Sequence, residues 1–379
     1  MPEVSGRLES CLYRKHEAFT LAILTGLAAL MFLFVTGLSH LYRSQEQAFA
    51  DQWSSRGVAQ LQARNFKPAV DDFRTALLYS TGNYSYQLSL AEALIGEGRA
   101  DEAKTYLMTL WARQPEDGLV NLELARIAAR QGETEKALRY YHNAIYATWP
   151  SDEESERRDT RLELVNYLLS IKANAQAQSE LIALAANLGE DSAMHARVGD
   201  LFAQTGDYRQ ALNEYRLSLR HGWSSRQALA GAGHAAFELA DYSQAEKYLQ
   251  QALADAPGDS ATASQLKTAE LAVDLDPFRQ QIRASERDQI VVKAFADAGQ
   301  RLQACQSNAG DAAAQSGLSA QWEKMKPDVT EQGLRRNPDL VNSAMELVFG
   351  IERQAENSCP ASTDTDTALL LIGKLHEGI

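Results

Sequence analysis

The stretch AQTGDYRQALNEYRLSL, residues 203–219, decides how this chain folds. Gly206 and Asp207 interrupt a run of residues that otherwise favour a helix. Ala211 and Tyr215 resume helical spacing immediately afterwards. Glycine adopts backbone conformations that a Cβ would strain, so the pair predicts a tight turn between two helices rather than one long helix.

Similar interruptions recur along the chain at a period of 34 residues. The six units are 50–83, 84–117, 118–151, 158–191, 192–225 and 226–259. Alanine occupies the twentieth position of every unit: Ala69, Ala103, Ala137, Ala177, Ala211 and Ala245. A large residue occupies the twenty-fourth: Phe73, Leu107, Tyr141, Leu181, Tyr215 and Leu249. The eighth position is small in all units except the fourth: Gly57, Ala91, Ala125, Val165, Gly199 and Gly233.

This pattern resembles the tetratricopeptide repeat family, in which each unit is a pair of helices that must stack on its neighbours to bury its apolar face. The resemblance implies an all-α, right-handed helical solenoid of about six repeats, with a concave groove lined by the first helix of each unit. The acidic insert DEESER, residues 152–157, separates the third unit from the fourth. We expect it to be a solvated loop, with an acidic docking patch as the alternative.

A candidate membrane anchor precedes the repeats. Residues 18–39, AFTLAILTGLAALMFLFVTGLS, carry no charge and are long enough to cross a bilayer at about 1.5 Å per residue. The run exceeds the roughly 7–15 apolar residues of a secretory signal. We therefore expect an uncleaved transmembrane signal anchor; the alternative is a signal peptide cleaved after AFA, residues 48–50.

Flanking cations predict the orientation of this span. Arg7, Arg14 and Lys15 precede it, and Arg43 is the near cation that follows. Cytoplasmic flanks carry the excess of Lys and Arg. We expect residues 1–17 to form a cytoplasmic tail and the soluble part to lie on the periplasmic side of the inner (plasma) membrane. Within the span, Ala22 and Gly26 form a small-xxx-small pair that would suit a homo-oligomer.

The cysteines bear on the same question. The chain contains Cys11, Cys305 and Cys359. With the expected topology, the exported part holds Cys305 and Cys359, which would suit one disulfide in an oxidising compartment. Two buried thiols are the alternative.

The chain after the repeats also predicts helices. Residues 260–275 predict a capping helix, so the solenoid with its cap spans 50–275, and 276–379 predict a C-terminal helical domain. Asp276 followed by Pro277 is typical of a helix start. The expected helices of this domain are 277–306, 318–326, 338–355 and 364–376.

Polar residues on the first helices are the candidate partner-binding site. The ninth and thirteenth positions of the units are expected to face the groove, where mixed donors and acceptors would bind an extended peptide backbone. The candidate residues are Glu92, Arg126, Arg130, Asn166, Asp200, Gln204, His234 and Glu238. The alternative is that any exposed helix face is polar.

Composition and motifs exclude other function classes. The formal net charge of −13 repels nucleic acid phosphate. The sequence contains no GxGxxG, P-loop, HExxH or GxSxG motif and no Cys/His cluster. We therefore expect no enzyme activity, no cofactor and no metal. The interpretation is a membrane-anchored, periplasm-facing interaction scaffold in envelope assembly, translocation or secretion. The alternative is a cytosol-facing membrane receptor or chaperone adaptor that uses the same groove.

Overall fold

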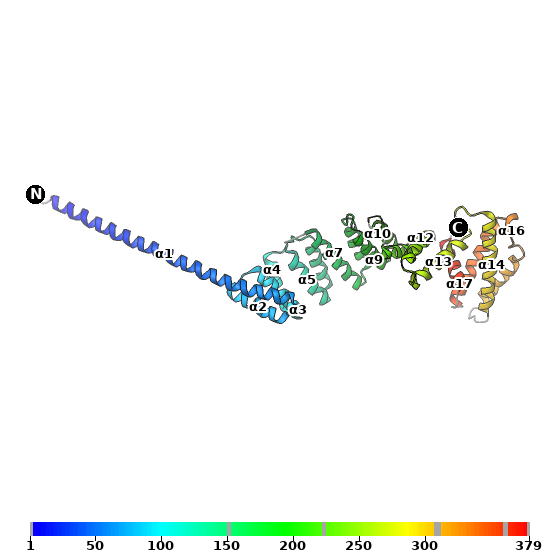
Figure 1. Ribbon diagram of the computed structural model, residues 1–379, viewed down its shortest axis with the longest axis horizontal. Coiled ribbons are helices and arrows are strands. Elements are labelled where there is room, and N and C mark those ends of the chain that lie inside the picture. Colours follow the sequence, from blue (N-terminus) through cyan, green and yellow to red (C-terminus); the bar gives the residue numbers. More distant parts are fainter. Residues whose placement is uncertain (1–2, 150–152, 222–224, 307–311, 359–362, 377–379) are drawn as a thin grey trace. The chain divides into compact units, whose positions relative to one another are not determined.

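The computed structural model describes residues 3–149, 153–221, 225–306, 312–358 and 363–376. The described residues are α-helical apart from turns and one isolated β-bridge, between Asp117 and Thr148. Figure 1 shows the helices in chain order. The all-α prediction is confirmed. The chain forms two compact units, residues 1–167 and 168–379.

The first unit contains one very long helix followed by paired shorter ones. Its elements are α1 (Glu3–Gln62), α2 (Phe66–Tyr79), α3 (Tyr84–Gly96), α4 (Ala100–Arg113), α5 (Gly118–Arg130), α6 (Thr134–Ile145) and the larger part of α7 (Glu153–Ser170). The second unit begins within α7. Its other elements are α8 (Asn174–Ala185), α9 (Ser192–Gln204), α10 (Tyr208–His221), α11 (Arg226–Glu238), α12 (Tyr242–Asp255), α13 (Ser260–Leu275), α14 (Ala284–Gln306), α15 (Ala312–Met325), α16 (Glu331–Arg336), α17 (Asp339–Ser358) and α18 (Asp364–Leu375).

Each expected repeat is a pair of helices. The end of α1 pairs with α2, and the pairs α3/α4, α5/α6, α7/α8, α9/α10 and α11/α12 follow in register with the 34-residue units. The expectation that DEESER forms a loop is wrong over the described part, because Glu153–Arg157 belong to α7. Glu and Arg are good helix formers, and acidic residues in a first turn also interact favourably with the helix dipole.

The turn within each pair falls at the fifteenth position of the unit, where the backbone is left-handed in all six repeats. The residues and φ angles are Arg64 (59°), Gly98 (87°), Gly132 (71°), Lys172 (59°), Gly206 (82°) and Ala240 (60°). The turn at Gly206, with its φ of 82°, therefore favours glycine for the reason expected from the sequence. In three repeats a residue with a Cβ adopts the same conformation at some energetic cost.

A short polar side chain starts most of the first helices. Asn83, Asp117, Asp191 and Ser225 each accept a hydrogen bond from the backbone N–H three residues ahead, at 2.9–3.4 Å. Asp259 caps α13 in the same way, at 3.2 Å. These residues stand at the last position of their units, so five of the six units end by capping the helix that follows.

Large residues at the twenty-fourth position fill the space that the glycines leave. The Tyr215 ring on α10 packs against Gly199 of α9 and Gly231 of α11. A Cβ built on Gly199 would lie 2.8 Å from Tyr215 Cε1, and one on Gly231 would lie 2.4 Å from Tyr215 Cζ. Both distances are shorter than any ordinary carbon contact. The close packing of small and large residues expected from the repeat pattern is thus present.

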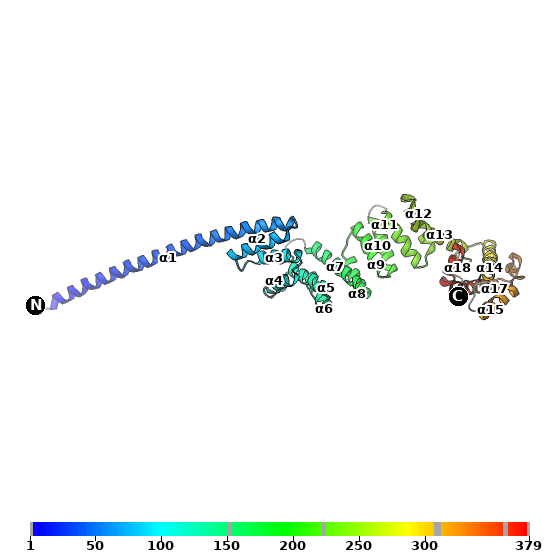
Figure 2. The same cartoon turned by 90° about the horizontal axis from the view of Figure 1, so that it is seen from below.

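The candidate span is the N-terminal part of α1. Within the described side chains, Ile23–Gln62 is long and apolar enough to cross a membrane. Large apolar side chains from Ile23 to Leu41 are exposed on this helix. Further along, Ala50 of α1 is fully buried against Ala76 of α2 and Tyr86 of α3. Figure 2 shows α2 running back along the last part of α1.

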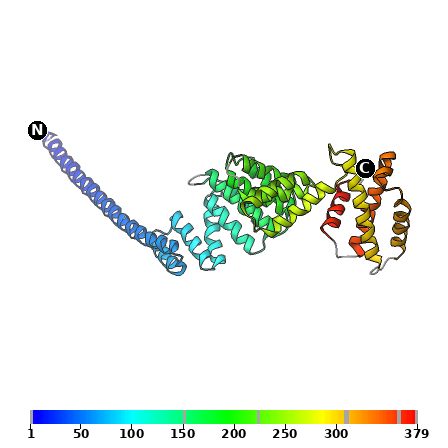
Figure 3. The same ribbon diagram turned by 45° about the vertical axis from the view of Figure 1, so that its right-hand side comes forward.

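The C-terminal helices share one hydrophobic core with the cap. Side chains of α13, α14, α17 and α18 pack in this core together with Tyr242 of α12 and Trp322 of α15. Figure 3 shows these helices, yellow to red, packed side by side. Among these C-terminal helices, buried Arg301 contacts Asp366 Oδ2 at 2.6 Å and Glu352 Oε2 at 2.9 Å.

The boundaries of these helices correct part of the prediction. The helix expected from residue 277 begins at Ala284. Asp276 instead accepts a hydrogen bond of 2.9 Å from the backbone N–H of Phe278, which makes it the first residue of a turn. The helix expected at 318–326 begins earlier, at Ala312, and α16 was not expected. The capping helix at 260–275 is confirmed, as are helices close to 338–355 and 364–376.

Of the two cysteines expected to form a disulfide, the structure describes one. Cys305 of α14 is 1% exposed and is disulfide-bonded. Cys359, its expected partner, lies outside the described residues, so the pairing Cys305–Cys359 stays a prediction.

Candidate functional site

The candidate site consists of the ninth- and thirteenth-position residues of the first helices, which we call the first-helix face. In the first unit, α3, α5 and α7 contribute Glu92, Arg126, Arg130 and Asn166. In the second unit, α9 and α11 contribute Asp200, Gln204, His234 and Glu238. The two sets are described separately.

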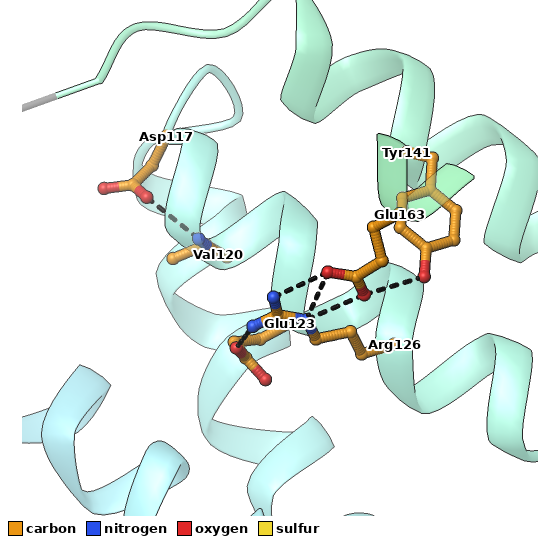
Figure 4. A network of polar contacts seen from close by, with 6 residues as sticks. All are labelled: Asp117, Val120, Glu123, Arg126, Tyr141 and Glu163. Carbon is orange, nitrogen blue, oxygen red and sulfur yellow. Dashed lines mark hydrogen bonds and ion pairs between the residues drawn. The ribbon is translucent and has the colours of Figure 1, made fainter. Parts of the chain in front are cut away.

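In the first unit, Arg126 joins two first helices. Its Nη2 lies 2.7 Å from Glu163 Oε2 and its Nε lies 2.9 Å from Glu163 Oε1, so the guanidinium on α5 holds both oxygens of a carboxylate on α7. Nη1 of Arg126 donates to Glu123 Oε1 at 2.5 Å. The buried Tyr141 hydroxyl of α6 donates to Glu163 Oε1 at 3.0 Å. Figure 4 shows these four side chains converging, with the cap between Asp117 and Val120 at the start of α5.

Electrostatics in this network follow from one cation among three carboxylates. Burial, and then the negative charge of Glu123, raise the pKa of Glu92, although Arg126 opposes them. Burial also acts to raise the pKa of Glu163, but the hydrogen bonds and charge of Arg126 outweigh it and hold that pKa below its ordinary value. The hydrogen bonds with Glu163 raise the pKa of Arg126. Arg126 therefore favours the ionised form of Glu163, whereas burial favours the neutral form of Glu92.

In the second unit, Asp200 of α9 has a comparable role. The Tyr215 hydroxyl donates to its Oδ1 at 2.7 Å, and the Gln227 amide of α11 donates to its Oδ2 at 2.5 Å. Burial and this hydrogen bond raise the pKa of Tyr215, so the phenol remains a donor. His234 of α11 lies 2.9 Å from the Gln265 side chain of α13, through Nδ1.

The structure thus divides seven of the predicted residues into two groups and sets Glu92 apart from both. The ninth-position residues Arg126, Asp200 and His234 bond to the first helix that follows, and so connect adjacent repeats. The remaining group is exposed on the same helices: Arg130, Asn166, Gln204 and Glu238. Glu92 is half-buried and reaches the network through its charge.

Sequence reasoning missed the partners of the ninth-position residues. Glu163 stands at the sixth position of its unit, Gln265 is the sixth residue of α13, and Gln227 stands at the second position of its unit. Glu123 precedes Arg126 by three residues, which is a helical neighbour. A search for polar residues at the second and sixth positions would have found them.

A buried polar pair lies behind the second unit's face. His195 is 3% exposed, with Nδ1 at 2.7 Å from Glu214 Oε2 and Nε2 at 3.1 Å from the Gly189 carbonyl oxygen. Both ring nitrogens of His195 therefore lie within hydrogen-bonding distance of an oxygen atom. The bonding accounts for this histidine structurally. Within the described side chains, no cluster of three or more His, Cys, Asp or Glu residues could hold a metal ion.

One family model matches part of the repeat array. Residues 60–127 and 94–148 match the family model described as tetratricopeptide repeat. No curated protein matches the sequence. Among solved structures, the chain is similar to PilF of Pseudomonas aeruginosa, with 19% identity, coverage of 58% of this chain and 96% of that one, and a TM-score of 0.40.

Two further solved structures are similar over a comparable length. One is PilW, a type IV pilus biogenesis factor, with 14% identity, coverage of 58% and 98%, and a TM-score of 0.39. The other is the C-terminal part of a repeat-containing protein from Cytophaga hutchinsonii, with 14% identity, coverage of 62% and 92%, and a TM-score of 0.46.

The observed repeats agree in their helix pairs, their left-handed turn and their capping residue. Part of the same array, residues 60–148, matches the family model. The chain therefore contains tetratricopeptide repeats, which the family model matches over residues 60–148. Such repeats form helical scaffolds that bind protein or peptide partners.

Proposed function

We propose that the chain is a membrane-anchored scaffold whose first-helix face binds an extended segment of a protein partner on the periplasmic side of the inner membrane, in envelope assembly, translocation or secretion. The protein acts by binding and performs no catalysis. Its anchor is the apolar part of α1.

The observation that carries the proposal is the division within the first-helix face. Arg126 is held in place by Glu163 and Glu123, so the helices that present the face are fixed before a partner arrives. Arg130 and Asn166 are exposed on the same helices. Fixed helices with exposed donors and acceptors reduce the ordering cost of binding a peptide.

The chemistry of the face favours a partner segment that carries cations. In the first unit, Glu92, Glu123 and Glu163 outnumber Arg126 and Arg130. Lys or Arg side chains of the partner would complement this excess, and long-range attraction would increase the association rate. Gln204 and Glu238 offer similar chemistry in the second unit.

Separate observations support the membrane anchor and the side of the membrane on which the repeats would lie. An uncharged run of 22 residues, 18–39, lies at the N-terminal part of α1 with more cations before it than after it. Cys305 is disulfide-bonded, which suits an oxidising compartment. Anchoring would keep the face close to partners in the same membrane and raise their effective concentration.

Site-specific photo-crosslinking tests the binding face. A photoreactive residue replaces Asn166 on α7 in the full chain, and a matched control replaces Glu135, which is exposed on the second helix α6. We expect cells to yield a crosslinked partner from position 166 but not from position 135. Equal yields from both positions would contradict binding at the first-helix face. Because the expected partner segment carries cations, Arg130→Glu, which makes the face more negative, should increase the yield of the partner crosslinked at 166.

A further inference from the structure

Three exposed apolar side chains gather at one end of the first repeat. Phe49 on α1 is 52% exposed, and Leu78 and Tyr79 at the end of α2 are 78% and 42% exposed. The rings of Phe49 and Tyr79 lie 5.7 Å apart between centroids, at 32°. We call these three residues the juxtamembrane patch. A cluster of exposed apolar side chains commonly marks a contact surface.

The patch is held rigidly on α1. The neighbouring Ala50 and Ala76 are fully buried, so α1 and α2 are in close contact directly beside it. The Tyr86 hydroxyl of α3 donates a hydrogen bond to Asp51 of α1, two residues after Phe49. Any movement of the candidate span is therefore transmitted to the patch through one continuous, laterally supported helix.

Its position along α1 indicates the occupant. Because α2 returns towards the N-terminal part of α1, Leu78 and Tyr79 lie at the end of the repeat nearest the apolar run (Figure 2). Leu41 and Tyr42 extend the exposed apolar surface just beyond residue 39. Phe49 follows Tyr42 by two helical turns, about 10 Å along the axis, and lies on the same side of the helix.

Measured from Tyr42, the backbone at Phe49 stands just outside the headgroup layer. A bilayer of about 40–45 Å contains about 30 Å of hydrocarbon, which leaves roughly 5–8 Å of headgroups on each side. A tilt of about 20° lowers this height by less than about 1 Å. The contact therefore depends on the aromatic ring of Phe49, which extends several ångströms from the helix axis and would reach the outer part of this layer. Tyr is enriched there because its ring is apolar and its hydroxyl is polar. Arg43, exposed between span and patch, can meet lipid phosphates.

We propose that Phe49, Leu78 and Tyr79 insert into the lipid headgroup layer of the membrane that α1 crosses, as a second attachment point for the first repeat. The inference rests on the anchor of the proposed function. With two attachment points, the first repeat is restricted in its tilt towards the bilayer. The lipid surface thereby orients the start of the first-helix face.

Lipid-quenching measurements on the full chain test this attachment. In a Cys11→Ser background, an environment-sensitive fluorophore is attached to Leu78→Cys, in vesicles of phosphatidylcholine and phosphatidylglycerol that contain a headgroup spin label. Lys67→Cys is the matched control, because it is exposed on the same side of α2 but eleven residues, about 16 Å, further from the span. The Cys11→Ser chain without an added cysteine is labelled in parallel. Its fluorescence measures the background labelling of Cys305 and Cys359, which is subtracted. We expect at least about twofold stronger quenching at residue 78 than at residue 67.

A third label separates failure of the patch from failure of the anchor. Val35→Cys places the fluorophore inside the apolar run, where acyl-chain spin labels should quench it. Quenching at 35 with equal quenching at 78 and 67 overturns the patch and leaves the anchor intact. Absence of quenching at 35 overturns both. An L78C–L78C disulfide dimer without quenching at 78 would assign the patch to a second copy of the chain and overturn the lipid contact.

Discussion

The guanidinium of Arg126 contacts both carboxylate oxygens of Glu163, one helix pair further along the array. A bidentate ion pair of this kind fixes distance and orientation together. Two first helices of the first unit are therefore connected by a polar contact in addition to their apolar packing. The first prediction concerns its removal.

Arg126→Ala should destabilise the first unit, because three carboxylates then lie together without their cation. Hydrogen bonds to charged groups contribute about 1.5–3 kcal/mol, and we expect a loss of about 1–2 kcal/mol because the side chain is about one third exposed. Thermal unfolding of the full chain in detergent micelles measures this loss in the free energy of unfolding. Arg130→Ala on the same helix is the control and should cost less than about 0.5 kcal/mol. Equal effects would show that the Arg126 contacts do not stabilise the unit.

Exchange of glycine and alanine at the left-handed turns gives a paired prediction. Ala240 has a φ of 60°, and Gly206 has a φ of 82° at the same position of the preceding repeat. Ala240→Gly should raise the free energy of unfolding of the second unit by about 0.5–1 kcal/mol, since it removes the Cβ strain. Gly206→Ala should lower it by about 1 kcal/mol. Changes of the same sign in chemical denaturation would contradict the interpretation.

Close packing around Tyr215 predicts sensitivity at Gly231. A Cβ on this residue would overlap the Tyr215 ring, so Gly231→Ala should destabilise the second unit by about 1–3 kcal/mol. Gly258→Ala is the control, because open space surrounds that glycine. Differential scanning fluorimetry compares the two. Tyr215→Leu combined with Gly231→Ala should recover part of the loss, and no recovery would exclude the ring as its cause.

A buried carboxyl in the C-terminal helices predicts a pH dependence. Burial, followed by the charge of Asp366, raises the pKa of Glu352 from 4.5 to about 8, although Arg301 opposes the shift. The folded chain therefore keeps a proton that the unfolded chain releases between about pH 4.5 and pH 8. The free energy of unfolding should fall as the pH rises through this window and level off above it.

Glu352→Gln should flatten that dependence, because an amide stays neutral at every pH. Relative to the wild type, the variant should gain about 1–3 kcal/mol between pH 5 and pH 8.5. Urea unfolding at several pH values provides the slope. Glu356→Gln, an exposed position on the same helix α17, should leave the slope unchanged. A slope that Glu352→Gln does not alter would show that another group titrates.

Local chemistry made the repeats predictable from the sequence. The left-handed turn at Gly206 favours glycine. Ala211 and Tyr215, four residues apart, show the helical spacing of α10. These signals are short in range and recur, so six registers reinforce one another. The helix boundary after Asp276 and Pro277 was harder to predict, because the same pair of residues can start either a helix or a turn. The choice depends on tertiary contacts such as that of Asp276 with His376, 3.0 Å apart.

The candidate site was predictable only in part. The ninth positions were found from the period, but their partners come from the following helix, as Glu163 does for Arg126. Which polar groups remain exposed depends on this pairing. Arg130 and Asn166 therefore stand out only once the helices are placed.

The side of the membrane that the first-helix face occupies is the most direct test of the central claim. Asn166→Cys in the full chain, with Cys11→Ser, is treated with a membrane-impermeant maleimide in sealed spheroplasts and again after lysis. An exported scaffold predicts complete labelling at residue 166 before lysis. Labelling only after lysis would contradict the account and favour a cytosol-facing adaptor.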